Sequence, residues 1–325
     1  MSQHRLLFVT TRTDPEEQAT PSKLMAGLTR PEASPDLVRW NLLPHEWIFG
    51  LFLVITWLRL TLHLGAMNPY ALIFLGGFAG AIATLWWAET NPTPARWRLR
   101  LLYYPMIVGI TFYTLGEAIP ALGTAKVDVP LLNLDRAIFG ETPAVIYQRW
   151  NYPWLNDVLM LGYLFFFIHL VAVPGAYCVR DLARFRQCIV GLFTVYGLGL
   201  FCYTLLPAGG PHRWMTFETP LTGPFVIPAT LALVNSGSNG VDVFPSLHLG
   251  LSFYLLVFDW WHERRRFWLC LVPCLVLWCS TVLLRFHYFV DLIGGLAVAL
   301  IGLFVAARFE QARRRGKDLN SIPPP

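Results

Sequence analysis

Residues 284–308 read LRFHYFVDLIGGLAVALIGLFVAAR, and this stretch decides the class of fold. Beyond Asp291 it carries no charge until Arg308. An apolar run of about 20 residues is long enough to cross the hydrocarbon core of a bilayer as a helix. Gly294 and Gly295 are small enough to let a second helix approach closely. The stretch therefore predicts a membrane-spanning helix against which another helix packs.

The composition extends this interpretation to the whole chain. Of its 325 residues, 55% are hydrophobic and 14% are charged, whereas soluble domains have about 45–50% apolar and about 25% charged residues. A soluble enzyme, an intrinsically disordered protein and a coiled coil are therefore excluded as descriptions of the whole chain. Eight apolar segments can be marked, at about 46–64, 70–88, 100–122, 157–178, 186–206, 246–261, 267–284 and 288–308. We expect an all-α integral membrane protein with about eight transmembrane helices.

The basic residues give the expected orientation in the membrane. If the N-terminus is cytoplasmic, 19 of the 25 Lys and Arg residues lie on the cytoplasmic side and five on the outer side, which fits the positive-inside rule. Both termini are then cytoplasmic. Residues 1–45 are expected to be a polar, disordered tail without a cleavable signal peptide, and residues 309–325 a basic tail. No basic stripe alternates with aromatic residues, so nucleic acid is not an expected partner.

Two long outer segments connect the helices. Within 123–155, Thr142 and Pro143 are typical of a helix start, and residues 143–150 predict a short helix in the membrane interface. Residues 207–245 are rich in Gly, Pro, Ser and Asn. A loop of that length in a compact membrane protein is expected to form a functional lid or floor.

Ionisable residues gather at the expected outer edge of the membrane. Three clusters fall there: residues 207–213 (PAGGPHR), 244–248 (FPSLH) and 285–291 (RFHYFVD). Because ionisable residues are costly at membrane depth, such a gathering is a candidate functional site. His287 and Asp291 are four residues apart at a helix start, so they are expected to share one face.

These residue types fit phosphoryl transfer. Asp291 can accept one imidazole N–H of His287 and leave the other nitrogen free as a nucleophile. His248, on another helix, is suited to act as general acid and then as general base. Arg285 and Arg213 supply fixed positive charge for phosphate oxygens. We expect a metal-independent reaction through a phosphohistidine, with no cofactor.

Further residues are candidates for binding phosphate or substrate. Ser246 and the backbone N–H groups at the start of its helix are expected to bind phosphate. The candidate substrate contacts are His212, Tyr288, Glu117 and His169. For Glu117 and His169, buried hydrogen bonding is an equally open interpretation.

Each feature alone also has a structural interpretation. A His-x-x-x-Asp pair in a membrane helix can be structural or part of a proton relay, and Arg285 or Arg213 could anchor the chain at the interface. His4, His45 and His262 are expected in solvated or interfacial positions. The six cysteines show no CxxC pair and no secreted spacing, so we expect them to act as small apolar residues. The joint placement of the clusters on one face is what favours a catalytic site.

At these positions the sequence resembles the type-2 phosphatidic acid phosphatase superfamily, and within it the inositol phosphorylceramide synthase branch, the aureobasidin-sensitive phosphotransferases. Residues 244–248 are similar to the second superfamily motif, usually Pro-Ser-Gly-His, with Leu247 in place of the glycine. Residues 284–291 are similar to the third motif, and their His-Tyr-Phe-Val-Asp is typical of the synthase-like branch. Residues 134–140 and 207–213 resemble further features of that branch.

The resemblance implies a six-helix catalytic core at residues 100–308, with residues 46–99 as two accessory helices. It also implies His287 as the nucleophile, Asp291 as its partner and His248 as the acid and base. These roles agree with those expected from the residue types alone.

Two features depart from the superfamily pattern. The usual first motif, Lys-x6-Arg-Pro, is not visible, and Thr281 stands where the superfamily has an arginine six residues before the nucleophile. Arg285 and Arg213 are candidates to replace those charges.

The expected function is that of a membrane lipid phosphotransferase. It would move a phospho-head group from a phospholipid donor to a lipid or polyol acceptor on the non-cytoplasmic face of the membrane. A lipid phosphate phosphatase, which releases inorganic phosphate, uses the same residues and stays open as an alternative. A transporter or scaffold without catalysis is the second alternative.

Overall fold

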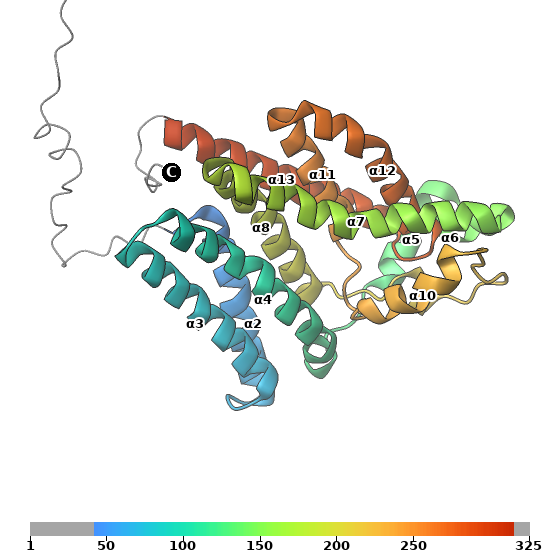
Figure 1. The fold of residues 1–325 in the computed structure, drawn as a ribbon. Coiled ribbons are helices and arrows are strands. Elements are labelled where there is room, and N and C mark those ends of the chain that lie inside the picture. The colour runs from blue at the N-terminus through green and yellow to red at the C-terminus, as the bar shows by residue number, and fades with distance from the viewer. Residues whose placement is uncertain (1–41, 315–325) are drawn as a thin grey trace, which may run out of the picture. The chain divides into compact units, whose positions relative to one another are not determined.

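The computed structural model describes residues 42–314, and every regular element in that range is helical (Figure 1). Eight long helices lie at the eight positions expected from the sequence. They are α2 (Pro44–Leu64), α3 (Pro69–Thr90), α4 (Pro94–Ala121), α7 (Pro153–Arg180), α8 (Leu182–Leu205), α11 (Leu247–His262), α12 (Arg264–Leu283) and α13 (Phe289–Arg314). The all-α fold is confirmed. Most of the two expected tails, and His4, lie outside the described residues, although α13 continues past the expected helix end at residue 308.

Six of these eight described helices are long and apolar enough to cross a membrane, so the chain is a multi-pass membrane protein. The two exceptions are α4 and α11. The first two turns of α4 carry Arg96, Arg98 and Arg100. Helix α11 has 16 residues, which corresponds to about 24 Å of a hydrocarbon core roughly 30 Å thick. Both pack on spanning helices, α4 on α3 and α8, and α11 on α13, α12 and α8.

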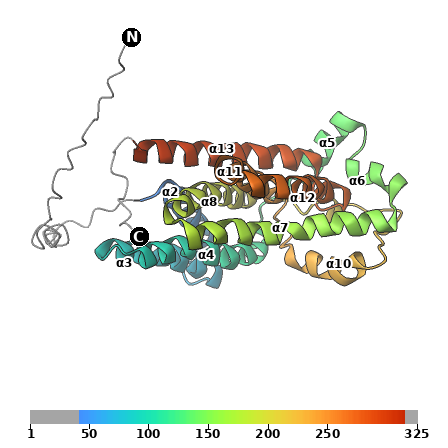
Figure 2. The same cartoon turned by 45° about the horizontal axis from the view of Figure 1, so that its top comes forward.

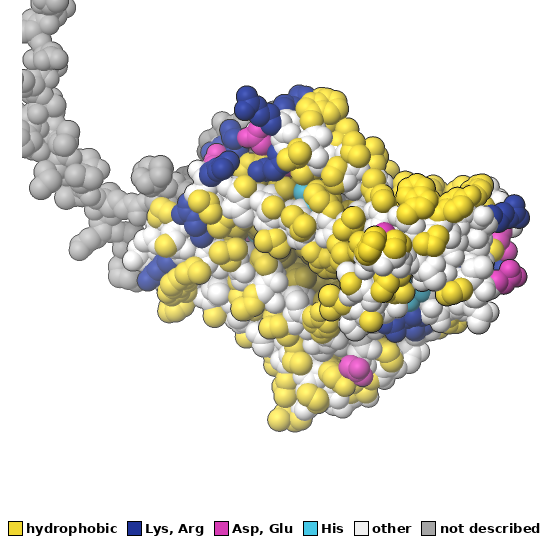
Figure 3. All heavy atoms as spheres, turned by 45° about the vertical axis from the view of Figure 1, so that its right-hand side comes forward, with side chains coloured by type: hydrophobic (Ala, Val, Ile, Leu, Met, Phe, Trp, Pro, Cys, Tyr) yellow, Lys and Arg dark blue, Asp and Glu magenta, His cyan; other side chains and the backbone are white. Residues whose placement is uncertain are grey.

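The surface of the described residues suits a bilayer. On the face drawn in Figure 3, hydrophobic side chains cover the middle, and most Lys, Arg, Asp and Glu side chains lie toward two opposite ends. Large apolar side chains are exposed along the spanning helices, for example Leu62, Val171 and Leu269. Lipid chains cover such a surface in a membrane, whereas in water it would drive association.

Proline and capping residues explain where most of these helices begin. Helices α2, α3, α4 and α7 each have a proline in the first turn, where its fixed φ fits and its missing N–H costs nothing. The side chains of Asn68, Thr93 and Asp181 accept hydrogen bonds from first-turn N–H groups of α3, α4 and α8.

Helix α8 is at the centre of the bundle. It packs against α2, α4, α7, α11 and α13, and Figure 2 shows α7, α8, α11, α12 and α13 running side by side. The glycines of α13 make the expected close approach. A β-carbon at Gly295 would collide with the carbonyl oxygen of Ser246, and one at Gly294 would meet the ring of Phe244. The starts of α11 and α13 are therefore pressed together.

Several residues expected at the cytoplasmic surface are buried instead, Arg100 and His45 among them. Arg100, counted among the basic residues of that side, binds Glu46 at 2.5 Å and Glu89 at 2.6 Å. His45 has no exposed surface and packs edge-on against Tyr104, with 4.7 Å between the ring centroids. The expectation for Arg100 was wrong because a basic residue in a buried ion pair has the same sequence pattern as one in a cytoplasmic loop. The expectation for His45 was wrong because the local pattern does not show that its ring packs against aromatic side chains.

The two outer segments fold into short helices at the end of the bundle where α11 and α13 begin (Figures 1 and 2). The first contains the expected short helix as α6 (Pro143–Ile146) and the 3-10 helix η1 (Tyr147–Trp150), and also an unexpected α5 (Asp128–Phe139). The second contains α9 (Pro211–Trp214) and α10 (Val226–Gly237), so it is not an unbroken loop.

Candidate active site

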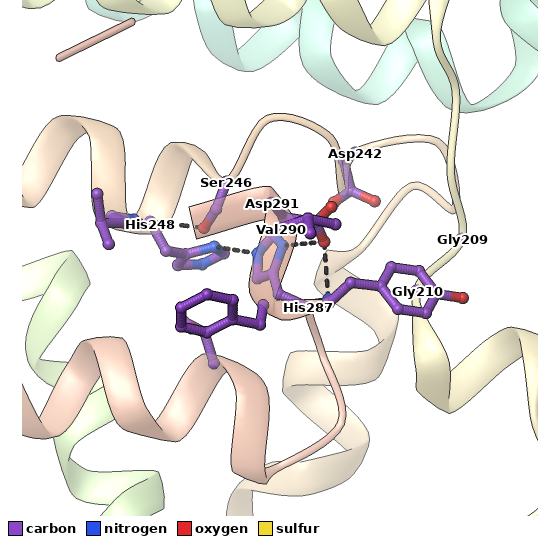
Figure 4. Close-up of polar contacts among 12 residues, drawn as sticks. Gly209, Gly210, Asp242, Ser246, His248, His287, Val290 and Asp291 are labelled. Carbon is purple, nitrogen blue, oxygen red and sulfur yellow. Dashed lines mark hydrogen bonds and ion pairs between the residues drawn. The ribbon is translucent and has the colours of Figure 1, made fainter. Parts of the chain in front are cut away.

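Two histidines from different helices meet at the end of the bundle where α11 and α13 begin. The Nδ1 of His248, in the first turn of α11, lies 3.2 Å from the Nε2 of His287, which precedes α13 (Figure 4). The 39-residue separation of the two in sequence is bridged by the packing of α11 on both α12 and α13. The pair expected from the motifs is therefore brought together.

Asp291 holds the second histidine from the other side. Its Oδ2 lies 3.4 Å from Nδ1 of His287 and also accepts the backbone N–H of Tyr288 at 2.8 Å. If Nδ1 of His287 carries the proton, it donates to Asp291 and leaves Nε2 with a lone pair that accepts from His248. The carboxylate thus selects the tautomer in which Nε2 is the nucleophilic nitrogen.

The imidazole of His287 is held in its neutral form. Burial lowers the pKa of His287 to about 4, against the opposing influence of Asp242 and of the Val243 backbone. Only 2% of the residue is exposed. A neutral ring at pH 7 has the free electron pair that a nucleophile needs.

Ser246 has a different role from the one expected. It is fully buried, and its Oγ accepts the backbone N–H of Leu249 at 3.4 Å, which makes it the N-cap of α11. Its own N–H donates to the carbonyl of Asp291 at 2.9 Å. Ser246 therefore links the start of α11 to the start of α13.

Two aspartates of α5 position the site, and the sequence interpretation did not identify them as functional residues. Asp135 is fully buried and accepts the backbone N–H groups of Phe289 and Val290 at 3.0 and 3.1 Å. It also accepts the hydroxyl of Thr142 at 2.8 Å. The first turn of α13 is capped by a side chain from another helix, which fixes His287 and Asp291 relative to α5.

The carboxylate of Asp128 holds the loop at residues 207–211 (PAGGP) in the same way. Its carboxylate accepts the N–H groups of Gly209 and Gly210 at 3.0 and 2.9 Å, and the hydroxyl of Tyr288 at 3.1 Å. Gly210 has φ +82, and a β-carbon there would meet the carbonyl oxygen of Phe286 at 2.5 Å, so only glycine fits. Tyr288 is fully buried. Its hydroxyl is engaged by Asp128, and its contact with substrate stays a prediction.

The two candidate phosphate-binding arginines bind the outer loops. Arg285 has φ 71, donates from Nη2 to the carbonyl of Thr219 at 2.7 Å and stacks over Phe217 at 4.0 Å. Its Nε is buried with no hydrogen-bond partner among the described residues. Arg213 is exposed and donates to the carbonyls of Asn235 and Ser238. Arg285 thus keeps a free donor, whereas Arg213 organises the segment around α10.

Three candidate substrate contacts remain to be placed. His212 donates its backbone N–H to the carbonyl of Arg285, and burial together with Arg213 lowers its pKa to about 4. His169 is buried and lies against Cys274, with 3.8 Å between Nδ1 and Sγ, and its Nε2 has no hydrogen-bond partner among the described residues. Glu117 is exposed on α4. Neither His169 nor Glu117 has a recorded contact with the histidine pair.

A cavity opens beside the histidines. It measures about 470 Å³ and is lined by residues of α4, α7, α8, α10 and α11, His248 among them. Asp242, just before α11, also lines it, and the sequence interpretation had not singled this residue out. Among the described residues, no cluster of three or more His, Cys, Asp or Glu could hold a metal ion.

Comparison with known proteins gives one match. A family model described as the PAP2 superfamily matches residues 129–305, which is more than half of the chain. The matched range begins in α5, ends in α13 and includes the histidine pair and Asp291. No curated protein and no solved structure matches the chain.

Proposed function

Since this chain belongs to the PAP2 superfamily, we propose that it is a membrane lipid phosphotransferase that works through a phosphohistidine on His287. The superfamily supports phosphatase or phosphotransferase chemistry on lipids. The single observation that carries the proposal is the line of contacts from His248 through His287 to Asp291, at 3.2 and 3.4 Å. In our proposal the donor is a phospholipid and the acceptor a lipid or a polyol.

In the first step, Nε2 of His287 attacks phosphorus and the bond from phosphorus to the leaving alcohol breaks. His248, in its protonated imidazolium form, gives one proton to that leaving oxygen and becomes neutral. Asp291 stabilises the positive charge that develops on the ring of His287, because its carboxylate faces Nδ1. The product of this step is a phosphohistidine that carries the head group.

The hydrogen bond between the two imidazoles has a consequence for this step. With Nδ1 of His248 3.2 Å away, the lone pair of Nε2 on His287 is engaged before substrate enters. The ring of His248 must therefore turn from His287 to the leaving oxygen as the phosphate arrives.

In the second step, an acceptor hydroxyl attacks the phosphohistidine. His248 removes the proton of that hydroxyl, and His287 leaves as the neutral ring. The unpartnered Nε of Arg285 is a donor available to the phosphate oxygens, which carry the developing charge. Arg213 contributes through its charge at the loop.

Transfer is favoured over hydrolysis by the branch-specific sequence His-Tyr-Phe-Val-Asp at residues 287–291. The test incubates purified protein with a labelled phospholipid, with and without ceramide, diacylglycerol or inositol, and identifies products by mass spectrometry. A new lipid phosphodiester supports transfer, and inorganic phosphate as the sole product would establish the phosphatase instead. His287→Ala is the control without a nucleophile.

We further propose that the site faces the non-cytoplasmic side, with both termini in the cytoplasm. The distribution of basic residues supports this orientation. Labelling of a single cysteine placed in the 207–245 segment, in sealed cells or vesicles, tests it. Lipid products unchanged by replacing both His248 and His287 would favour a non-catalytic transporter or scaffold.

A further inference from the structure

The cavity beside His248 has the size and lining of a ligand site. Its volume of about 470 Å³ is within the usual range for small-molecule pockets. The walls are mostly aromatic and aliphatic and include Phe112, Phe166 and Tyr196. Since α7 and α8 are membrane-spanning helices, this apolar space is placed where hydrocarbon is the surrounding medium.

One acidic group interrupts the apolar lining. Asp242 is the only carboxylate among the described residues that line the cavity. Its Oδ1 accepts hydrogen bonds from the hydroxyl of Ser238 at 2.8 Å and the N–H of Gly240 at 3.2 Å, which fix its direction. No hydrogen bond is recorded for Oδ2 in the described part of the chain. Figure 4 shows the Asp242 side chain beside the His287–Asp291 pair.

A carboxylate at this place needs an explanation, because it repels the phosphate that the histidines would process. A positive or hydrogen-bond-donating group between the two anions would remove the repulsion. No Lys or Arg is among the residues that line the cavity. A donor on the ligand itself could supply this group.

We propose that this cavity binds the hydrocarbon of the lipid whose phosphate reaches His287, and that Asp242 binds a hydroxyl or ammonium donor in the headgroup of that lipid. The inference rests on the proposed function and specifies its substrate class. The apolar walls bind the hydrocarbon chain of the lipid. The second carboxylate oxygen of Asp242 favours a headgroup that can donate a hydrogen bond. A zwitterionic headgroup without an N–H or O–H donor is disfavoured.

The first experiment measures binding without turnover, in the His287→Ala protein. Phosphatidylethanolamine, phosphatidylglycerol and phosphatidylcholine, each with a diazirine in one acyl chain, are photocrosslinked and the labelled peptides identified. We expect labels on α4, α7 and α10, and stronger labelling by the lipids with an ammonium or hydroxyl donor than by phosphatidylcholine. The ethanolamine and glycerol lipids distinguish the two kinds of donor.

Two substitutions test the two halves of the proposal separately. Asp242→Asn keeps an acceptor for Ser238 and Gly240 but removes the charge, so the preference over phosphatidylcholine should fall about tenfold or more. Gly109→Phe places a ring in the cavity, because a β-carbon there meets no atom within 4 Å. It should reduce labelling by every lipid at least tenfold. Gly76→Phe is equally unobstructed on α3, outside the lining, and is the control.

The outcomes separate this inference from the proposed function. If the lipids label α4, α7 and α10 of a wild-type protein that transfers no phosphate, the lipid site is supported and the proposed phosphotransferase activity is contradicted. An active enzyme whose labelling is insensitive to Gly109→Phe would reject the cavity as the lipid site. An unchanged preference in Asp242→Asn would reject the role of Asp242.

Discussion

The carboxylate of Asp135 accepts the backbone N–H of Phe289 at 3.0 Å, although the two residues are 154 positions apart in the sequence. The same carboxylate accepts the next N–H, that of Val290. A residue of α5 thus caps the start of α13. The two capped N–H groups lie between the nucleophile candidate His287 and its partner Asp291. This contact fixes the backbone between the two residues that we propose as the catalytic pair.

Replacing this cap should lower both stability and turnover. In Asp135→Ala, two first-turn N–H groups of α13 lose their acceptor, so we expect unfolding to be easier by about 1–2 kcal/mol. The pair also loses its alignment, and turnover should drop at least tenfold. Thermal unfolding in detergent and kcat for lipid phosphotransfer measure the two effects.

Thr142→Val is the matched control for that prediction. It removes the hydroxyl that donates to Asp135 at 2.8 Å and leaves both acceptor contacts to α13 in place. We expect a loss of turnover several times smaller. An Asp135→Ala enzyme with full kcat would show that α5 does not position the site.

The two histidines should differ in the residual activity that their variants keep. His287→Ala removes the nucleophile and should reduce activity to background. His248→Ala leaves the contact of His287 with Asp291 intact and removes only proton transfer, so turnover should fall about 10²–10⁴-fold. Quenched-flow kinetics with a labelled phospholipid would measure the turnover of both variants. In His248→Ala, a phosphohistidine should be trapped only when the leaving group of the donor needs no proton. Label retained on His287→Ala protein would contradict the assignment of the nucleophile.

The acid limb of the pH profile should lie well below the ordinary range of histidine. Burial lowers the pKa of His287 from 6.5 to about 4, and only the neutral ring can attack phosphorus. The acid limb of kcat/KM should therefore be near pH 4. Asp242 raises this pKa, so Asp242→Asn should move the limb to lower pH. A limb near pH 6.5 would show that the ring is solvated in the working enzyme.

The sequence predicted the eight long helices because each is a long apolar run, often with a proline in its first turn. It also predicted that His248, His287 and Asp291 lie together, since charge asymmetry and hydropathy placed their clusters on one face. The structure brings these three residues into contact. Their chemical roles remain our proposal.

What the sequence could not show is which polar residues are turned inward. Asp128 and Asp135 lie in a segment of mixed polarity, where an aspartate that caps another helix looks like a surface residue. The hydroxyl of Tyr288, a candidate substrate contact, is engaged by Asp128, which the local pattern did not indicate. Contacts across 150 residues or more depend on the tertiary packing, which local pattern does not encode.

The two arginines should respond differently to replacement by lysine. Arg285 is buried, stacks on Phe217 and has an unpartnered Nε. Lysine keeps the charge but loses the planar fork, so kcat/KM should fall about 10–100-fold in Arg285→Lys. Arg213→Lys, at an exposed position, should change it less than threefold. Equal losses in the two variants would mean that total charge, and not the geometry of Arg285, binds phosphate.

The buried ion pair of Arg100 should determine stability without affecting the chemistry. Its guanidinium binds both carboxylate oxygens of Glu46, at 2.7 and 2.5 Å, and one oxygen of Glu89 at 2.6 Å. The side chain of Glu46 is 2% exposed and that of Glu89 15%. In Glu46→Gln the buried charge of Arg100 is balanced by Glu89 alone, so the protein should be destabilised by about 3 kcal/mol.

Glu89→Gln should cost less, because water can replace part of the lost interaction at the more exposed position. Both variants should keep the wild-type kcat per folded molecule, since Arg100 lies near the start of α4 and the outer segment contacts the other half of that helix through Asn239 and Phe112. Denaturation in detergent, followed by circular dichroism, would give the order of stability. If Glu46→Gln lowered kcat while the protein stayed folded, the two ends of the bundle would have to be coupled through α4.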